Sequence, residues 1–289
     1  DLTPMLRYSE DSGLYYELRP GLDEDFRGGR VVTDARGFRV RPGTGREDST
    51  AEEGATVPPV PWTERPLRLA VVGASSTFGY GLPVQAIYPE LLRERLVQHT
   101  GRPVELLNAS VPAYNALQQA RLFERDVLPW RPDLVVWHYD HRDAFPVLQR
   151  GAPVRLHPGY GDNALGSLAL KLMARRLRAR EIARLRDDGG AMSLCETYPA
   201  GGPSYEAHLQ ALRGVGRLAR EHGVPVLMLL FDAYVRRLPA GPQHYRRLHA
   251  PLVEVLHEEQ LGVLDLFDPY QQLMEERGWA DLRSCWMSR

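Results

Sequence analysis

Short apolar runs alternate with segments of helical periodicity along most of the chain, and this alternation restricts the possible folds more than any other feature. Five runs are strand-sized, rich in valine and leucine, and bounded by glycine, proline or polar residues; they lie at 68–73, 103–108, 132–139, 224–231 and 262–267. Helical spacing fills the intervals, at 83–101, 113–129, 163–186, 204–223, 242–260 and 269–278. Continuous apolar runs are typical of parallel strands buried on both faces, and parallel strands require crossover helices. We therefore expect an α/β fold, a three-layer α/β/α sandwich around a parallel five-stranded sheet in the order 2-1-3-4-5.

The N-terminal part of the chain has a different composition, because it is polar and rich in glycine, proline and acidic side chains. Short strands or extended arms are expected at 13–21 and 29–40, and a loop or linker at 41–61. The chain is thus divided into an N-terminal extended arm and linker at 1–66 and a main domain at 67–289. It begins without a methionine and ends without a closing helix, so we expect a trimmed chain that lacks the C-terminal segment of the domain.

Composition and charge narrow the classes of partner. The chain has 289 residues, 43% of them hydrophobic, and a net charge of −1, so it can bury a sizeable core and gives no reason to expect nucleic acid as a partner. No apolar run reaches the length of a transmembrane segment, and no signal peptide is visible, so the sequence does not indicate a compartment. The two cysteines, Cys195 and Cys285, make neither a disulfide framework nor a metal site, and no metal or cofactor is expected.

The loop after the first apolar run, GASSTFGYG at 73–81, combines flexible backbone with hydroxyl side chains. In a parallel α/β sheet, ligands bind at the carboxyl ends of the strands, which is where this loop lies. Three interpretations follow: a strand-to-helix turn capped by Ser or Thr, a cradle for a phosphate such as that of FMN, or a turn that presents Ser75 as a nucleophile beside backbone N–H groups. The loop has no lysine, so it does not match a Walker-type phosphate loop.

Two further polar clusters follow the second and third apolar runs and favour the nucleophile. Asn108–Ser110 closes the second run, and Asp140–Asp143 follows the third. Because adjacent parallel strands end at one edge of the sheet, these side chains and Ser75 should converge there. The sequence therefore predicts one site built from three strand ends.

These three stretches resemble the sequence blocks of the SGNH, or GDSL-type, hydrolase family of esterases and acyl-carbohydrate esterases. VVGASSTFGYGLPVQAIYPELLRERL is similar to the first block, in which a strand is followed by G-D-S or G-x-S and a yP-x-x-L helix. VELLNASVPAYN resembles the second block, N-x-G-x-x-G, and PDLVVWHYDHRDA the third, G-x-N-D. The resemblance runs from about Arg68 to the C-terminus, and the N-terminal YELRPG and TDARGFR resemble the leader of some members. The family fold is a flavodoxin-like α/β/α sandwich, in agreement with the strand count.

The resemblance implies roles for individual residues, with Ser75 as the nucleophile. Ser110 stands where the family has the glycine whose backbone N–H serves the oxyanion hole, and Arg142 stands where it has an asparagine that donates to the oxyanion. A backbone donor survives a change to serine if φ stays negative, and arginine brings donors and a positive charge on a longer side chain. Ala74 replaces the aspartate of G-D-S, which is not the nucleophile. The other expected site residues are Ala74, Ser76, Asn108 and His141.

The general base is the largest departure from the family pattern. In the family, the base is the histidine of an Asp-x-x-His motif just before a final helix. This sequence has no such motif between Asp265 and Arg289. Without that histidine the serine has no base. His138 is more typical of a packed or hydrogen-bonded side chain, whereas His141 lies in the loop that forms the site. Solvent exposure is expected for three histidines of one charged helix, His244, His249 and His257.

Two classes of function stay open. The first is a serine-dependent esterase that hydrolyses or transfers a short acyl group on a small-molecule or glycan ester, in a chain trimmed before its catalytic Asp-x-x-His. The second is a catalytically inactive SGNH-like domain that binds a glycan or an acyl group, which the replacements at Ser110 and Arg142 favour. A flavin-binding protein is a more distant third. Trimming explains the missing base and the missing helix with one cause, so the esterase is the function we expect.

Overall fold

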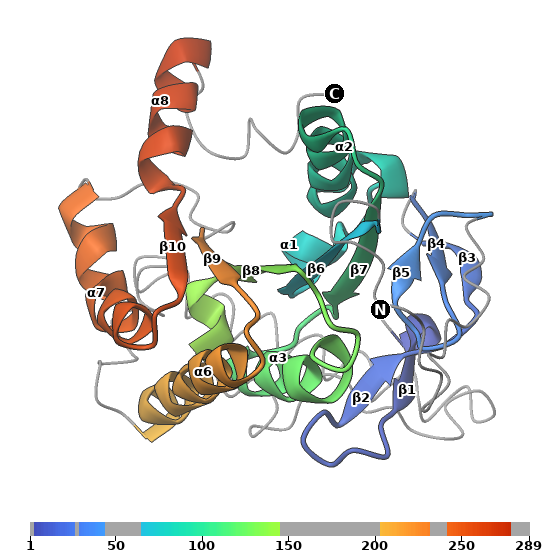
Figure 1. The fold of residues 1–289 in the computed structure, drawn as a ribbon, viewed down its shortest axis with the longest axis horizontal. Helices are drawn as coiled ribbons and strands as arrows, with labels where there is room; N and C mark the ends of the chain where they lie inside the picture. Colours follow the sequence, from blue (N-terminus) through green and yellow to red (C-terminus); the bar gives the residue numbers. More distant parts are fainter. Residues whose placement is uncertain (1–2, 27–28, 44–64, 145–202, 232–241, 279–289) are drawn as a thin grey trace, which may run out of the picture.

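The computed structural model describes residues 3–26, 29–43, 65–144, 203–231 and 242–278. Its central sheet consists of the strands β6 (Leu67–Gly73), β7 (Val104–Ser110), β8 (Leu134–Tyr139), β9 (Val226–Leu230) and β10 (Gly262–Asp265). The strands lie in the order β7-β6-β8-β9-β10, which is 2-1-3-4-5 when they are numbered along the chain, and each neighbouring pair is parallel. The parallel five-stranded sheet expected from the apolar runs is therefore confirmed (Figure 1).

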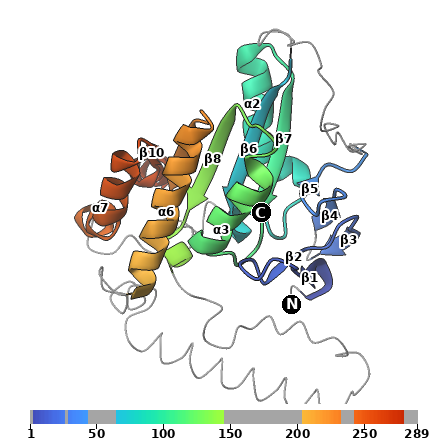
Figure 2. The ribbon, with the colours of Figure 1, turned by 60° about the horizontal axis from the view of Figure 1, so that its bottom comes forward.

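Helices cover the two faces of the sheet. The helical segments of the described main domain are α1 (Ser75–Phe78), η2 (Val84–Ala86), α2 (Tyr88–Thr100), α3 (Ala116–Leu122), η3 (Phe123–Val127), η4 (His141–Ala144), α6 (Pro203–Glu221), α7 (Pro242–Glu258) and α8 (Phe267–Arg277). On one face, Leu92 and Leu96 of α2 pack against a cluster that contains Val136 of β8. On the other face, Trp137 donates from Nε1 to Gln119 Oε1 of α3 at 2.7 Å, and Tyr139 contacts histidine rings of α6 and α7. Consecutive residues of β8 thus serve opposite faces, and the three-layer sandwich is confirmed (Figure 2).

The helix expected at 113–129 begins later than its apolar pattern indicates. Asn115 is the N-cap, because its Oδ1 accepts from Gln118 N at 3.0 Å while Gln118 Oε1 accepts from Asn115 N at 3.2 Å. This reciprocal pair satisfies two backbone donors that a helix start otherwise leaves unpaired. The helix expected at 163–186 lies outside the described residues.

The described part of the N-terminal segment is built from short antiparallel strands that lie beside β7 in Figure 1. Its elements are η1 (Thr3–Met5), β1 (Leu6–Tyr8), β2 (Tyr16–Leu18), β3 (Asp23–Phe26), β4 (Gly29–Thr33) and β5 (Arg39–Val40). β1 pairs with β2, and β3, β4 and β5 form a second sheet. The segments 13–21 and 29–40 contain β2, β4 and β5, whereas β1 and β3 lie outside the stretches expected to be extended.

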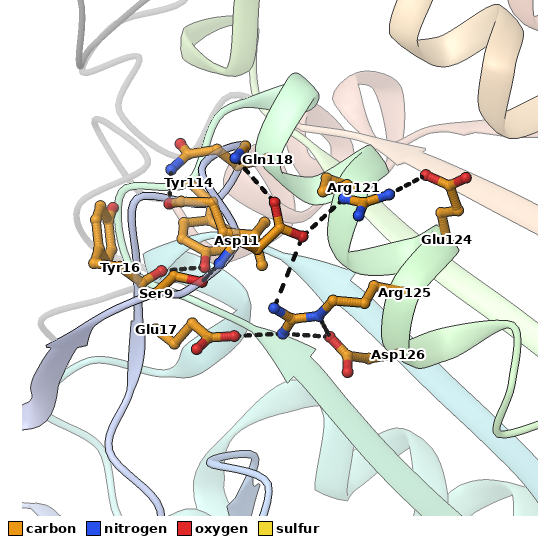
Figure 3. Close-up of polar contacts among 12 residues, drawn as sticks. Ser9, Asp11, Tyr16, Glu17, Tyr114, Gln118, Arg121, Glu124, Arg125 and Asp126 are labelled. Carbon is orange, nitrogen blue, oxygen red and sulfur yellow. Dashed lines mark hydrogen bonds and ion pairs between the residues drawn. The ribbon is translucent and has the colours of Figure 1, made fainter.

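The hairpin β1–β2 packs on the connection between β7 and α3. Tyr16 Oη donates to Pro112 O at 3.0 Å, Tyr114 Oη donates to Tyr16 O, and Gln118 Nε2 donates to Leu14 O at 2.8 Å. Ion pairs of Asp11 and of Glu17 with arginines of α3 and η3 flank these contacts (Figure 3). The boundary between an arm at 1–66 and a domain at 67–289 stays a prediction.

One further property of the fold concerns membranes. Throughout the described ranges, each helix is too short or too polar to serve as a transmembrane span. The longest of them, α6, carries charged residues at both ends, with Glu206 in its first turn and Arg220 in its last.

Candidate active site

Ser75 begins a single helical turn immediately after the central strand β6. Ala74 precedes it with φ −105° and ψ −146°, and Gly79 ends the turn in the left-handed region, with φ 74°. Gly79 N donates to Ser75 O at 3.1 Å, which closes the turn. Ser75 and Ser76 are partly exposed, whereas the next two residues of α1 are fully buried. The turn therefore places two serine hydroxyls at the carboxyl edge of the sheet and anchors itself through the residues that follow.

The second block ends at Ser110, which is the register partner of Gly73 on β6. Ser110 is a strand residue and is not among the residues with positive φ, so a serine fits this backbone without strain. Its side chain is fully buried and donates to Asn108 Oδ1. Asn108 Nδ2 is buried without a hydrogen-bond partner. Because Ser110 turns its hydroxyl inward, only its backbone N–H is suited to the oxyanion role that we expect.

The third block forms the short helix η4 directly after β8. Asp140 and Asp143 are buried, and Asp143 Oδ2 accepts from Asp140 N at 3.2 Å while Asp143 N donates to Asp140 O at 2.7 Å. The backbone thus places Arg142 at the carboxyl end of β8. The side chains of His141 and Arg142 lie outside the described part of the structure, so their roles in binding and in the oxyanion hole stay predictions.

The strand order brings the three blocks to one edge of the sheet. β6 lies between β7 and β8, and all three run parallel. Ser75, Ser110 and the 140–143 segment therefore follow three adjacent strand ends on the same edge. This is the arrangement in which a nucleophile and its oxyanion donors can act on one carbonyl group.

A buried hydrogen-bonded chain beneath the Ser75 turn was not expected from the sequence. Thr77 Oγ1 lies 3.2 Å from His138 Nδ1, Tyr88 Oη donates to Thr77 Oγ1 at 3.2 Å, and His138 Nε2 lies 2.9 Å from Phe231 O. His138 was interpreted as a packed or hydrogen-bonded side chain, and the structure places it in the interior with both ring nitrogens paired.

The other histidines divide between core and surface. His208 of α6 is fully buried, and both of its ring nitrogens have partners, Tyr205 O and Tyr139 Oη. His249 of α7 is also buried, which corrects the expectation that it is exposed. It shares a helix face with Leu252 and Leu256, at spacings of three and seven residues, and that face packs into the core. The exposed His257 follows the expectation, and the side chain of His244 lies outside the described residues.

The chemistry of the candidate site rests on hydroxyl and amide groups. Among the described residues, no group of three or more His, Cys, Asp or Glu side chains is placed to hold a metal ion. Tyr88, close to the turn, has its pKa raised by burial. It therefore stays protonated at neutral pH and acts as a hydrogen-bond donor.

Comparisons with known proteins give structural likenesses only. No family model matches the chain, and no curated protein matches it. The solved structure of AlinE4, described as a SGNH-hydrolase family esterase, is 16% identical, with 69% of this chain and 76% of that chain covered and a TM-score of 0.41. TesA is 19% identical over 68% of this chain and 76% of its own, with a TM-score of 0.41. The acetyl xylan esterase AlAXEase is 13% identical over 73% and 83%, with a TM-score of 0.44. SGNH-hydrolase esterases are thus among the solved proteins similar to this chain, but a likeness this distant carries no argument about activity, which rests on the residues themselves.

Proposed function

We propose that the chain is the catalytic domain of a serine-dependent esterase, in which Ser75 attacks the carbonyl carbon of a short-chain ester. The observation that carries the proposal is the place of Ser75, on a tight turn at the carboxyl end of the central strand, between the ends of β7 and β8. In the SGNH-like sequence blocks, this position belongs to the nucleophile. The N–H of Ser110 and the guanidinium of Arg142 are the proposed donors to the oxyanion of the tetrahedral intermediate.

The proposed reaction has two steps. Ser75 Oγ bonds to the acyl carbon, its proton goes to the base and on to the departing alcohol, and an acyl-serine remains. Water then attacks the acyl-serine, releases the carboxylic acid and restores the serine. An alcohol in place of water would give acyl transfer instead. The polar and aromatic composition of residues 145–167 favours short acyl groups carried by sugars.

A serine hydroxyl titrates far above neutral pH and needs an adjacent base to react. His138 and His208 have other partners for both ring nitrogens, so neither is proposed for this role. We propose that the base comes from an Asp-x-x-His motif, as the sequence blocks imply, and the sequence up to Arg289 does not contain one after Asp265. The assay therefore compares this chain with the product of the reading frame that encodes it, read to its stop codon.

The first prediction tests this function with p-nitrophenyl acetate. We expect the 289-residue chain to be nearly inert and the product of the complete reading frame to be active. Removing the base leaves only a residual of about 10³–10⁴-fold over water from oxyanion donors and binding. In the complete protein, Ser75→Ala should reduce activity to that background. Ser12→Ala, at an exposed serine of the N-terminal segment, is the control and should retain activity.

Two outcomes would contradict the esterase. Full activity of Ser75→Ala would mean that the turn serves only as a helix start. An inactive complete protein on a panel of acetyl, butyryl and acetylated sugar esters would favour the second candidate, an inactive domain that binds a glycan or an acyl group. The observation that favours this alternative is that Ser110 and Arg142 stand in place of the glycine and asparagine of the sequence blocks.

A further inference from the structure

The single turn α1 has little stability of its own. Its N-cap, Ala74, provides no side-chain hydrogen bond, and the turn is four residues long. Phe78 N donates to Ala74 O at 2.9 Å and Gly79 N to Ser75 O at 3.1 Å, which are the bonds of one isolated turn. A helix this short does not persist without tertiary contacts, because nucleation is unfavourable. The orientation of Ser75 must therefore be fixed by the side chains that anchor α1.

Thr77 reaches the sheet at a point where β6 has no side chain. A Cβ atom placed on Gly73 would lie 2.1 Å from Thr77 Oγ1 and 2.8 Å from Thr77 Cβ. The glycine is thus required by the close approach of Thr77 rather than by its backbone angles. Val72 of β6 pairs with Trp137 of the neighbouring strand β8. The next residues along the two strands are Gly73 and His138, so these two lie beside each other. The side chain of Thr77 therefore packs directly on Gly73, with its Oγ1 atom 3.2 Å from Nδ1 of His138 on β8.

The hydrogen bonds of this chain have a fixed direction when the ring of His138 is neutral. Phe231 O can only accept, so the nearby Nε2 carries the proton of the ring. Nδ1 is then an acceptor, and the hydroxyl of Thr77 donates to it. Tyr88 Oη in turn donates to Thr77 Oγ1 at 3.2 Å. Each group in this series therefore has a defined donor or acceptor role. The hydrogen bonds run from Tyr88 of α2 through Thr77 of α1 and His138 of β8 to the carbonyl of Phe231, directly after β9.

We propose that Thr77, His138 and Tyr88 are positioning residues that hold the turn carrying Ser75 in its reactive orientation. This inference rests on the proposed role of Ser75 and adds to it the device that fixes the nucleophile. None of the three acts on substrate; they act through the backbone of α1. His138 contributes as a neutral ring in the Nε2–H tautomer, which links Thr77 of α1 to Phe231, the residue directly after β9.

The experiment compares Thr77→Val with Thr77→Ser in the complete protein. Valine keeps the shape of threonine but removes the hydroxyl, so His138 Nδ1 loses its donor and Tyr88 Oη its acceptor. We expect kcat to fall about 10- to 100-fold with KM unchanged, because a displaced nucleophile affects the chemical step. Amide hydrogen exchange in the 73–82 segment should rise about five- to tenfold. Thr77→Ser should restore both readouts.

Thr33→Val provides the matched control for loss of a buried threonine hydroxyl. Thr33 Oγ1 accepts from Leu22 N at 2.9 Å and donates to Arg19 O at 2.6 Å, in the N-terminal segment. This variant should lower thermal stability without changing kcat or exchange at 73–82. If Thr77→Val behaves in the same way as Thr33→Val, the chain is only structural and the proposal is wrong.

A spectroscopic readout makes the inference independent of turnover. ¹⁵N-detected histidine spectra of the parent should show the Nε2–H tautomer for His138, and protonated Nδ1 in a neutral ring would contradict the proposed direction. Exchange and ¹⁵N spectra need no activity. They therefore decide whether Thr77 and His138 anchor the turn even if the Ser75→Ala assay shows that the proposed esterase function is wrong.

Discussion

Among the described residues, His208 has a pKa well below its ordinary value, and its ring lies buried between two tyrosines. Its Nδ1 lies 2.6 Å from Tyr205 O, and Tyr139 Oη lies 3.1 Å from its Nε2. The ring stacks on Tyr139 at 5.9 Å and meets Tyr205 edge-on at 4.7 Å. Burial in this aromatic environment disfavours the charged ring and lowers the pKa of His208 to about 4, although the carbonyl of Tyr205 acts in the opposite direction.

The second prediction is a loss of stability in acid that depends on His208. The folded-state pKa of about 4 lies below the ordinary value of 6.5, so the unfolded state binds the proton more readily. The neutral ring makes its full contribution to the free energy of unfolding above pH 6.5. As pH falls from 6.5 toward 4, the free energy of unfolding decreases by about 3 kcal/mol. Urea unfolding at several pH values should show this slope in the parent. His208→Phe should be less stable at pH 7 but should have a shallower slope.

The control for His208→Phe is His222→Gln, at an exposed position directly after the same helix. Acidic side chains add their own acid dependence to every variant, so the difference in slope between variant and parent isolates the histidine. Equal slopes for parent and His208→Phe would show that the ring is not the group that must be kept neutral.

At the level of side chains, the sequence predicts polar clusters at three adjacent strand ends, but it does not predict the contacts that support them. The three polar clusters follow from local patterns, because each comes directly after an apolar run. The contact of Thr77 with His138 joins residues 61 positions apart and depends on the strand order and on the space above Gly73. The buried state of His249 likewise depends on which helix face meets the core, and a run of charged neighbours in the sequence conceals it.

Among the elements, strands buried on both faces are clear in the sequence, and the partly exposed edge strand β10 is predicted as well. β6 and β8 have almost entirely buried side chains, so their apolar runs are continuous and clear. β1 and β3 expose most of their residues, and β3 has the sequence DEDF, so neither has an apolar pattern that sequence analysis can detect. These strands owe their conformation to pairing with neighbours rather than to their own composition.

The turn α1 is also held from the N-terminal segment by Arg39 of β5. Arg39 Nη1 donates to Phe78 O at 2.5 Å and to Gly79 O at 3.0 Å, and its Nη2 donates to Leu82 O at 2.7 Å. The guanidinium lies over the Phe78 ring, 4.8 Å from its centroid. Burial lowers the pKa of Arg39 to about 10, which leaves the side chain charged at neutral pH. A buried cation thus satisfies the carbonyls at the C-terminal end of the turn.

The third prediction is that Arg39→Met loosens this turn. Methionine keeps an unbranched stem against Phe78, but four backbone carbonyls lose their charged donor, those of Arg30, Phe78, Gly79 and Leu82. Removal of a buried charge offsets part of this loss, so we expect a net decrease of about 2 kcal/mol in the free energy of unfolding and faster exchange at 76–82. Arg36→Met is the matched control, because Arg36 lies over the Phe38 ring at the surface. If both variants unfold and exchange alike, Arg39 does not support the turn.

For the molecule as a whole, the N-terminal segment shares one core with the α/β sandwich. Eight of its apolar side chains are buried in the same cluster as residues of α3, α6 and α7: Met5, Leu6, Leu14, Tyr16, Leu18, Leu22, Val31 and Phe38. Full burial of such side chains contributes about 1.5–3 kcal/mol each, or roughly 12–24 kcal/mol for all eight, as an upper estimate. The ion pairs at the same contact, Arg121 with Asp11 and Arg125 with Glu17 (Figure 3), are partly exposed and add little by comparison.

The last prediction follows from the difference between the large contribution of the buried apolar side chains and the small contribution of the ion pairs. A specific protease site inserted between Thr50 and Thr56 allows the N-terminal segment to be cut from the rest of the folded chain. We expect the two fragments to co-elute in gel filtration and to stay together in 1 M salt, because buried apolar area holds them and salt screens only the ion pairs. In urea they should separate in the same transition that unfolds the sheet. Cleaved Leu14→Ala, which removes one fully buried side chain from the contact, should release the fragment at a lower urea concentration. A fragment that dissociates at once, and leaves a remainder with unchanged circular dichroism and midpoint, would instead support an arm at 1–66 that is separate from the domain.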